Sequence, residues 1–136
     1  MFSIDFPAQA EHVSTARIFC AAVARHFGCD ASDIEDLKIA LSEACASAIS
    51  HGAAGGGSPV RVVASPGGGM LTFEVNGELR QQLESRAGAD SMDNTGQQML
   101  ALSAELIAAL FPDAQFIDTP EGTFFKISVA AENAPS

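Results

Sequence analysis

The segment from residue 37 to residue 52 constrains the fold more than any other part of this sequence, because it has the pattern of a helix with one buried side. Its small and apolar residues recur at intervals of three and four positions, as on one face of an α-helix: Leu37, Leu41, Ala44, Cys45 and Ala48. Glu43 lies well away from this stripe, and Ser47 follows it by one helical turn. Two oxygen-bearing side chains one turn apart suit a metal–phosphate group, and they are equally typical of a solvated helix face.

Two further helices are predicted on either side of this segment. Residues 11–27 have helical spacing and are closed by Gly28, at the position where glycine commonly ends a helix. Residues 97–110 form the third helix, and their expected buried stripe consists of Met99, Leu102, Leu106, Ile107 and Leu110. A capping-box pattern, Ser32 followed three residues later by Glu35, places the start of the central helix at Ser32.

Alternation of apolar and polar residues predicts five short strands, at residues 2–6, 60–64, 70–75, 114–117 and 123–129. Turn residues at 66–69 and at 119–122 are expected to join two pairs of these strands, and the polar residues 78–94 are expected to form a loop or lid. The order of elements predicts an α+β fold, a two-layer sandwich in which about three helices cover one face of a mixed, mostly antiparallel sheet. No repeat or second domain is visible, so residues 1–136 are expected to form one domain.

The composition limits the classes of partner and compartment. Seventeen acidic residues against seven Lys and Arg give a formal net charge of −10, which argues against direct binding of nucleic acid and favours a basic protein partner. Cys20, Cys29 and Cys45 lack the spacing of metal ligands, so none is expected to be catalytic or metal-bound. The amino terminus does not resemble a signal peptide, and no apolar run approaches the ~20 residues that span a bilayer. A reduced cytoplasm without membrane contact is therefore predicted.

From about Phe2 to Val129, the order of elements and the central helix resemble the anti-sigma factor serine kinases of bacteria, members of the GHKL superfamily of ATPases. The helix carries the family's Ser-Glu-Ala triplet as Ser42-Glu43-Ala44 and the following histidine as His51. The resemblance implies a GHKL-type fold, ATP and Mg²⁺ as cofactors, and Glu43 as the general base. The family's magnesium-binding Asn is replaced by Ser47, whose hydroxyl can contact Mg²⁺ but lacks an amide oxygen.

Two other nucleotide-binding elements of the family are altered in this sequence. An Asp-x-Gly-x-Gly turn, whose Asp accepts a hydrogen bond from adenine, corresponds to residues 75–79, where Gly77 stands in place of the Asp. Asn76 is one position away, and a shift of one residue in a strand turns the side chain to the other face. Of the glycines that wrap the phosphates at a helix amino terminus, only Gly96 is present. The resemblance thus implies a weakened nucleotide site made of Ser47, Asn76, Gly77 and Gly96.

In function, the resemblance implies an anti-sigma regulatory factor that sequesters an alternative sigma factor. Its second partner would be an anti-anti-sigma protein with a STAS-type domain, and such chains commonly act as homodimers. Three possibilities stay open. The chain is a binding module with weakened or lost ATP binding, an active serine kinase that phosphorylates the STAS partner with Glu43 as base, or a degenerate ATPase-fold domain with a different regulatory partner.

Overall fold

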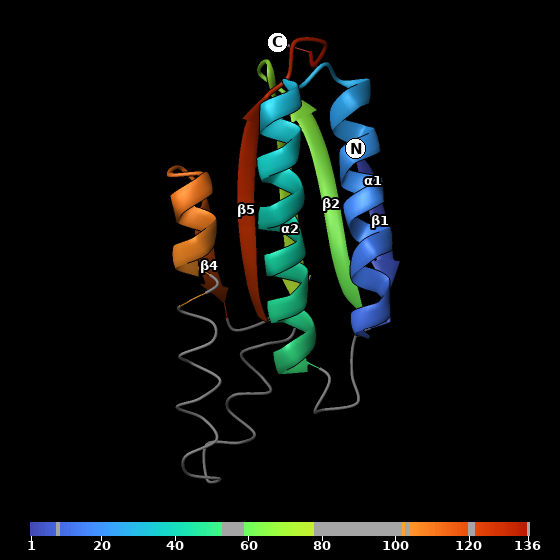
Figure 1. Cartoon of the computed structure of the whole chain (residues 1–136), viewed down its shortest axis with the longest axis vertical. Coiled ribbons are helices and arrows are strands. Elements are labelled where there is room, and N and C mark those ends of the chain that lie inside the picture. Colours follow the sequence, from blue (N-terminus) through green and yellow to red (C-terminus); the bar gives the residue numbers. More distant parts are fainter. Residues whose placement is uncertain (8, 53–58, 78–101, 103, 120–121, 136) are drawn as a thin grey trace, which may run out of the picture.

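The computed structural model describes residues 1–7, 9–52, 59–77, 102, 104–119 and 122–135 (Figure 1). It has five strands: β1 (Phe2–Phe6), β2 (Val60–Gly67), β3 (Met70–Gly77), β4 (Gln115–Thr119) and β5 (Gly122–Ala130). A short 3₁₀ turn, η1 (Ala10–His12), leads into α1 (Val13–His26), which is followed by α2 (Ala31–Gly52). Residues 102 and 104–110 are also helical.

The strands form a single sheet in the order β1-β2-β3-β5-β4, and every described pairing is antiparallel. The helices lie against one face of this sheet (Figure 1). Residues that point toward the helices are buried, among them Val62 on β2, Phe73 on β3 and Ile127 on β5. Successive side chains of a strand point to opposite sides, so the other face carries the alternate residues. Several of them are polar, such as Arg61, Thr72 and Ser128, whereas Val63 and Met70 are apolar. The predicted α+β two-layer sandwich is confirmed.

The buried face of α2 is confirmed residue by residue. All five residues of the predicted stripe are between 0% and 4% exposed: Leu37, Leu41, Ala44, Cys45 and Ala48. They belong to one apolar cluster with the inward residues of the sheet and the buried residues of α1. Burying a leucine side chain contributes about 1.5–3 kcal/mol. This face therefore attaches α2 to the sheet and fixes the rotation of the helix about its axis.

The hairpin between β2 and β3 has a shorter turn than the sequence predicted. Only Gly68 and Gly69 lie between the strands, with φ of +63° and +73°. Two positive φ angles in a two-residue loop match the right-handed twist of the flanking strands, and glycine adopts them without steric cost. Pro66 and Gly67 are consequently part of β2, opposite Leu71 and Met70.

The start of α2 differs from the prediction. The helix begins at Ala31, and the backbone N–H of Ile34 donates to the carbonyl oxygen of Asp30 at 2.9 Å. Asp30 therefore stands at the N-cap position, and Ser32 lies inside the first turn instead of capping it. The capping-box pattern placed the N-cap two residues too late in the sequence, because Asp30 is itself a favourable N-cap residue.

The predicted buried stripe of the third helix is wrong in part. Leu102 is 64% exposed and Leu106 is 43% exposed, whereas Ile107 is buried at 1%. This helix stands at the edge of the layer, beside β4 and β5 (Figure 1), so it turns a narrower face to the core than α2 does. Met99 and the predicted loop or lid at 78–94 lie outside the described residues.

The turn between α1 and α2 is closed by Gly28, as the sequence predicted. The Gly28 N–H donates to the Arg25 carbonyl oxygen at 3.1 Å, and the Cys29 N–H donates to the Ala24 carbonyl oxygen at 3.0 Å. These two bonds, with a Gly28 φ of +74°, make a Schellman motif that satisfies the last carbonyls of α1. The carboxyl-terminal segment packs on this turn, since the Asn133 N–H donates to the Phe27 carbonyl oxygen at 2.8 Å.

Replacing Gly28 by alanine is expected to lower the free energy of unfolding by about 1–2 kcal/mol, the cost of a left-handed conformation with a side chain. The added Cβ would also lie only 3.0 Å from the Asn133 side-chain nitrogen. Gly67→Ala is the matched control, because its Cβ would have no neighbour within 4 Å. Urea denaturation of both variants measures the difference, and equal stabilities would contradict the assignment.

Candidate functional site

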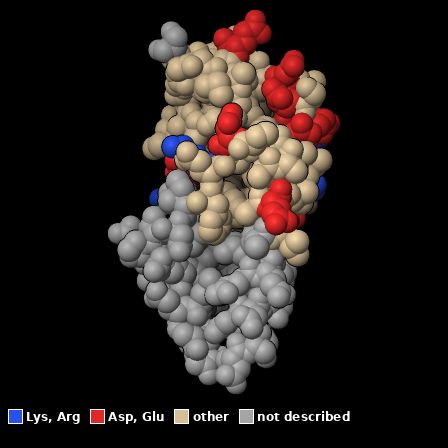
Figure 2. Space-filling model, turned by 90° about the vertical axis from the view of Figure 1, so that its left-hand side faces the viewer, with Lys and Arg blue, Asp and Glu red and all other residues tan. Residues whose placement is uncertain are grey.

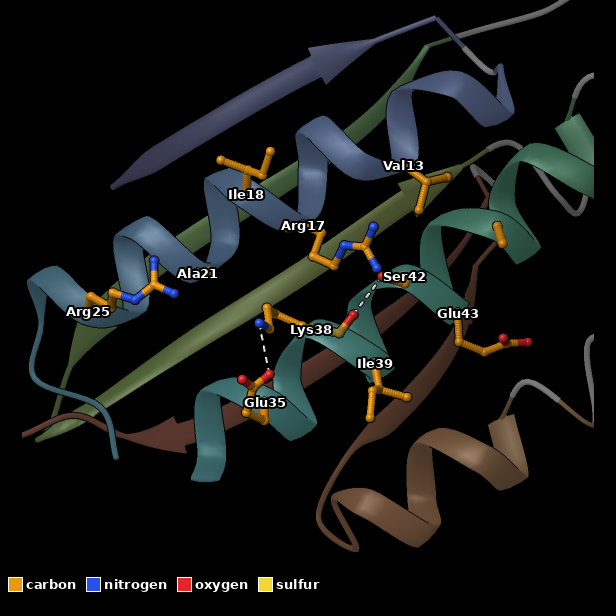
Figure 3. Close-up of a pocket in the computed structure, with 11 residues that line it drawn as sticks. Val13, Arg17, Ile18, Ala21, Arg25, Glu35, Lys38, Ile39, Ser42 and Glu43 are labelled. Carbon is orange, nitrogen blue, oxygen red and sulfur yellow. Dashed lines mark hydrogen bonds and ion pairs between the residues drawn. The ribbon is translucent and has the colours of Figure 1, made fainter. Parts of the chain in front are cut away.

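Glu43 occupies the flank of α2, between the buried face and the solvent. Its neighbour Ala44 is fully buried, Ala46 is exposed, and Glu43 itself is half-buried. The carboxylate is directed away from α1 (Figure 3). Ser47 lies one turn further along α2, as the sequence predicted. Glu43 is thus placed on the flank of α2, the middle helix of the layer (Figure 1), where a ligand beside α2 could reach it.

Asn76 lies on the opposite face of the sheet from the helices. Val75, directly before it on β3, is 1% exposed and belongs to the core cluster. Because side chains alternate along a strand, Asn76 points to the other side, where its cross-strand partner on β2 is the exposed Arg61. The structure therefore does not bring Asn76 together with Glu43.

Gly77 is the last residue of β3 and pairs with Thr123 of β5. Because it comes two residues after Val75, it belongs to the same face of the sheet, the face that the helices cover. It lies at the end of the central strand of the sheet, at the position where the resemblance expects an aspartate, and it has no side chain that could accept a hydrogen bond. Gly96 lies outside the described residues.

ATP and Mg²⁺, which the resemblance implies, fit this arrangement poorly. On the helix side, Glu43 is a carboxylate that could act on a substrate proton. The described end of β3 supplies no acceptor there for adenine, because Asn76 faces away and Gly77 lacks a side chain. Within the described ranges, no three His, Cys, Asp or Glu side chains are grouped closely enough to hold a metal ion. The described residues thus provide a candidate base without the groups that would fix a nucleotide beside it.

A groove between α1 and α2, on the side of the helix layer away from the sheet, was not found by sequence reasoning. It has a volume of about 780 Å³ and is lined by residues of both helices (Figure 3). Its charged lining residues are three basic ones and two carboxylates: Arg17, Arg25, Lys38, Glu35 and the candidate base Glu43. The Ser42 hydroxyl donates to the Lys38 carbonyl oxygen at 2.6 Å, so α2's own backbone satisfies it. The sequence shows the four-residue spacing of these lining residues along each helix. Only the tertiary structure shows that the two helices lie side by side and form a groove.

The groove has its own ion pair. Lys38 Nζ lies 2.8 Å from Glu35 Oε2, one turn apart on α2. The hydrogen bond from Lys38 holds the pKa of the Glu35 carboxyl below its ordinary value, and the charges of Lys38 and Arg25 act in the same direction. Both basic side chains therefore lie near Glu35, on the two sides of the groove.

The cysteines are placed as buried hydrophobic residues. Cys20 on α1 and Cys45 on α2 are both 0% exposed and belong to the core cluster. Burial raises the pKa of Cys20 far above its ordinary value and raises that of Cys45 to about 12. Cys29, in the turn between the helices, is half-buried, and burial with the nearby Asp33 raises its pKa as well. Because the thiolate is the reactive form, none of the three is suited to nucleophilic chemistry near neutral pH.

Comparison with known proteins places this geometry in context. The family model of the histidine kinase-like ATPase domain matches residues 6–127. The proteins named serine-protein kinase RsbW from Bacillus thuringiensis (strain Al Hakam), Bacillus cereus (strain B4264) and Bacillus anthracis (strain A0248) are each 49% identical to this chain over 48 residues. That region is 35% of this chain and 30% of each relative, so the similarity spans less than a third of the relatives' length.

Within the described part of the chain, no helix is both long and apolar enough to cross a bilayer.

The thiols are expected to react in a fixed order with dithionitrobenzoate at about pH 8. Cys29 alone should react in the folded protein, and slowly, whereas Cys20 and Cys45 should react only after unfolding in guanidinium, because both are 0% exposed. The Cys29→Ser variant is the matched control and should release almost no chromophore while folded. Rapid modification of that folded variant would contradict the packing of α1 on α2.

Proposed function

Because this chain belongs to the family of histidine kinase-like ATPase domains, we propose that it acts as an anti-sigma regulatory factor. It binds an alternative sigma factor and withholds that factor from RNA polymerase, and a STAS-domain anti-anti-sigma protein counteracts it. The local similarity to proteins named serine-protein kinase RsbW supports this assignment within the family. We place the chain in the cytoplasm as one domain, residues 1–136, that works as a homodimer without contacting nucleic acid or membrane.

A binding role is favoured over catalysis by the residues at the family's nucleotide-contacting positions. Ser47 replaces the magnesium-binding Asn, and Gly77 replaces the Asp that accepts from adenine. The orientation of Asn76, on the sheet face away from the helices, is the single observation that carries this preference, because it removes the nearest substitute acceptor. Each lost polar contact costs about 1 kcal/mol or more in a desolvated site, so the loss of three weakens binding by about 3 kcal/mol or more, which is roughly a hundredfold or more.

The second candidate function is that of an active protein serine kinase acting on the STAS partner. It is favoured by Glu43, which keeps the family's position for the base and is half-buried on the flank of α2. In that case Glu43 would accept the proton of the partner's serine hydroxyl and Ser47 would help to hold Mg²⁺. Bound ATP would supply the phosphoryl group to the serine oxygen, with ADP as the leaving group. The names of the RsbW relatives are in keeping with this activity.

Titration with Mg-ATP distinguishes the two candidates. Calorimetry of the wild-type chain is expected to show no saturable heat up to millimolar nucleotide, because the contacts to adenine and magnesium are missing. The Ser47→Asn/Gly77→Asp double variant is expected to gain measurable affinity, and Ser3→Asn on the exposed strand β1 serves as a matched control. Saturable wild-type binding near or below about 100 μM, with phosphate transfer that is lost in Glu43→Gln, would establish the kinase instead.

Capture of the partners tests the regulatory role itself. The tagged chain is co-expressed with each sigma factor and each STAS-domain protein encoded in the same genome. One sigma factor is expected to co-purify, and addition of one STAS-domain protein is expected to release it. Recovery of neither class of partner would contradict the proposed function, whatever the outcome with nucleotide.

A further inference from the structure

The helix formed by residues 102 and 104–110 runs antiparallel to α2. The turn before α2 lies beside the end of β5, because the Asn133 N–H donates to the Phe27 carbonyl oxygen at 2.8 Å. β4 is antiparallel to β5, so β4 begins at that same end of the sheet. Only residues 111–114 separate the helix from β4, and the helix therefore ends where α2 begins (Figure 1).

The contact between α1 and α2 shows which flanks of two neighbouring antiparallel helices face each other. The residues that line the groove between them include those that directly follow a buried residue of their own helix, as Arg25 and Lys38 do. On a helix of 3.6 residues per turn, a residue that directly precedes a buried one lies on the opposite flank. Asp36 and Glu43 each precede a buried residue, so they lie on the flank of α2 that is turned away from α1.

The same geometry places two leucines opposite this flank of α2. Figure 1 shows the helix of residues 102 and 104–110 on the side of α2 away from α1. Because this helix is also antiparallel to α2, its facing flank holds the residues that precede its buried position, Ile107. These residues are Leu106 and, one turn earlier, Leu102. Figure 3 shows Ile39 and Glu43 of α2 pointing away from α1, toward this side.

The two facing flanks are exposed and apolar. Leu102 is 64% exposed, Leu106 is 43% exposed, and Ile39 is 51% exposed. A leucine that packed directly against a neighbouring helix would be buried, so α2 does not cover these two leucines. Leu102 and Leu106 are four residues apart, as are Ile39 and Glu43, and residues at this spacing form ridges onto which a further helix can pack.

Carboxylates border these apolar residues. Asp36 on α2 and Glu105, between the two leucines, take part in none of the ion pairs among the described residues. Figure 2, which shows the side of the molecule with β4 and residues 104–110, has several carboxylates and few basic side chains. This surface is therefore complementary in charge to a basic ligand. The five Lys and Arg of the described part of the chain lie in the groove between α1 and α2 or on the far face of the sheet: Arg17, Arg25 and Lys38 in the groove, Arg61 and Lys126 on the sheet.

We propose that this surface, formed by Asp36 and Ile39 of α2 with Leu102, Glu105 and Leu106 of the neighbouring helix, is the docking site for a basic amphipathic helix of a protein partner. The partner's apolar residues cover Ile39 and the two leucines, and its Lys or Arg side chains lie against Asp36 and Glu105. The contact rests on the proposed function, in which the chain acts by binding other proteins. Because it lies on the side of α2 away from α1, it leaves the groove between α1 and α2 open.

The test uses a fluorescein-labelled, stapled helical peptide of about 20 residues with leucines on one face, lysines beside them and no acidic residue. Fluorescence anisotropy with the full chain is expected to show saturable binding at sub-millimolar concentration. Salt at about 0.15 M screens the general attraction of the peptide to an acidic protein. A peptide of the same composition in scrambled order should bind about tenfold more weakly or less. Asp36→Lys and Leu102→Ser should each weaken binding of the amphipathic peptide by about tenfold or more.

Two matched variants separate local contact from general effects. Glu11→Lys changes the net charge by the same amount as Asp36→Lys, at a side chain of η1 that is 73% exposed. Ile18→Ser matches Leu102→Ser, because it removes a side chain that is 69% exposed on α1. Both control variants should retain affinity within about twofold. Circular dichroism confirms that each variant is folded, and light scattering after gel filtration reports its oligomeric state.

Each remaining outcome overturns the proposed docking site. Absence of binding does so, as do equal binding of the scrambled peptide and unchanged affinity in both Asp36→Lys and Leu102→Ser. Equal losses in Asp36→Lys and Glu11→Lys would indicate long-range charge alone. Conversion of a dimer to a monomer by Asp36→Lys or Leu102→Ser would assign the surface to a second copy of this chain. Capture of a sigma factor by a wild-type chain that fails to bind the peptide would overturn only the docking site, whereas peptide binding without capture of either partner would overturn only the proposed function.

Discussion

The burial of one face of α2 against the sheet is the interaction on which the rest of the structure depends. Leu37 and Leu41 supply apolar area, and the small residues Ala44 and Ala48 let the helix lie close to β2 and β3. Close packing allows only one rotation of the helix about its axis. That rotation places Glu43 on the flank of α2. It also turns Lys38 outward, into the groove that α2 forms with α1. Both the candidate base and the groove are therefore consequences of the same packing.

The other face of the sheet carries two polar contacts between neighbouring strands. Arg61 Nε lies 2.7 Å from Asp5 Oδ1, and its guanidinium holds the pKa of that carboxyl below its ordinary value. The Thr72 and Ser128 hydroxyl oxygens are 2.9 Å apart across β3 and β5. Asn76 shares this face, on the opposite side of the sheet from α2 and Glu43.

Much of the fold could be predicted because it follows from local periodicity. Three features are examples: the apolar–polar alternation in β1, the apolar stripe of α2 and the glycine that ends α1. Each has its physical cause in residues that are close together in the sequence. The predictions failed where two local patterns compete, or where the position of another secondary-structure element determines which residues are buried. Asp30 and Ser32 are both favourable N-cap residues, and the sequence alone does not determine to which carbonyl oxygen the Ile34 N–H donates its hydrogen bond. Leu102 and Leu106 have helical spacing, but how wide a face is buried depends on where that helix stands in the layer.

The candidate site divides in the same way. The sequence by itself determined the α+β class, the buried face of α2, and which residue types stand at the family's nucleotide-contacting positions, because these properties depend on composition and spacing along the chain. Alternation along the strand also predicted that Asn76 turns away from the position of the expected Asp. Only the tertiary structure decided that the helices, and Glu43 with them, lie on the opposite side of the sheet from Asn76. It alone also joined Arg17 and Arg25 with Lys38 in one groove, because charges on two helices add up only when packing sets the helices side by side.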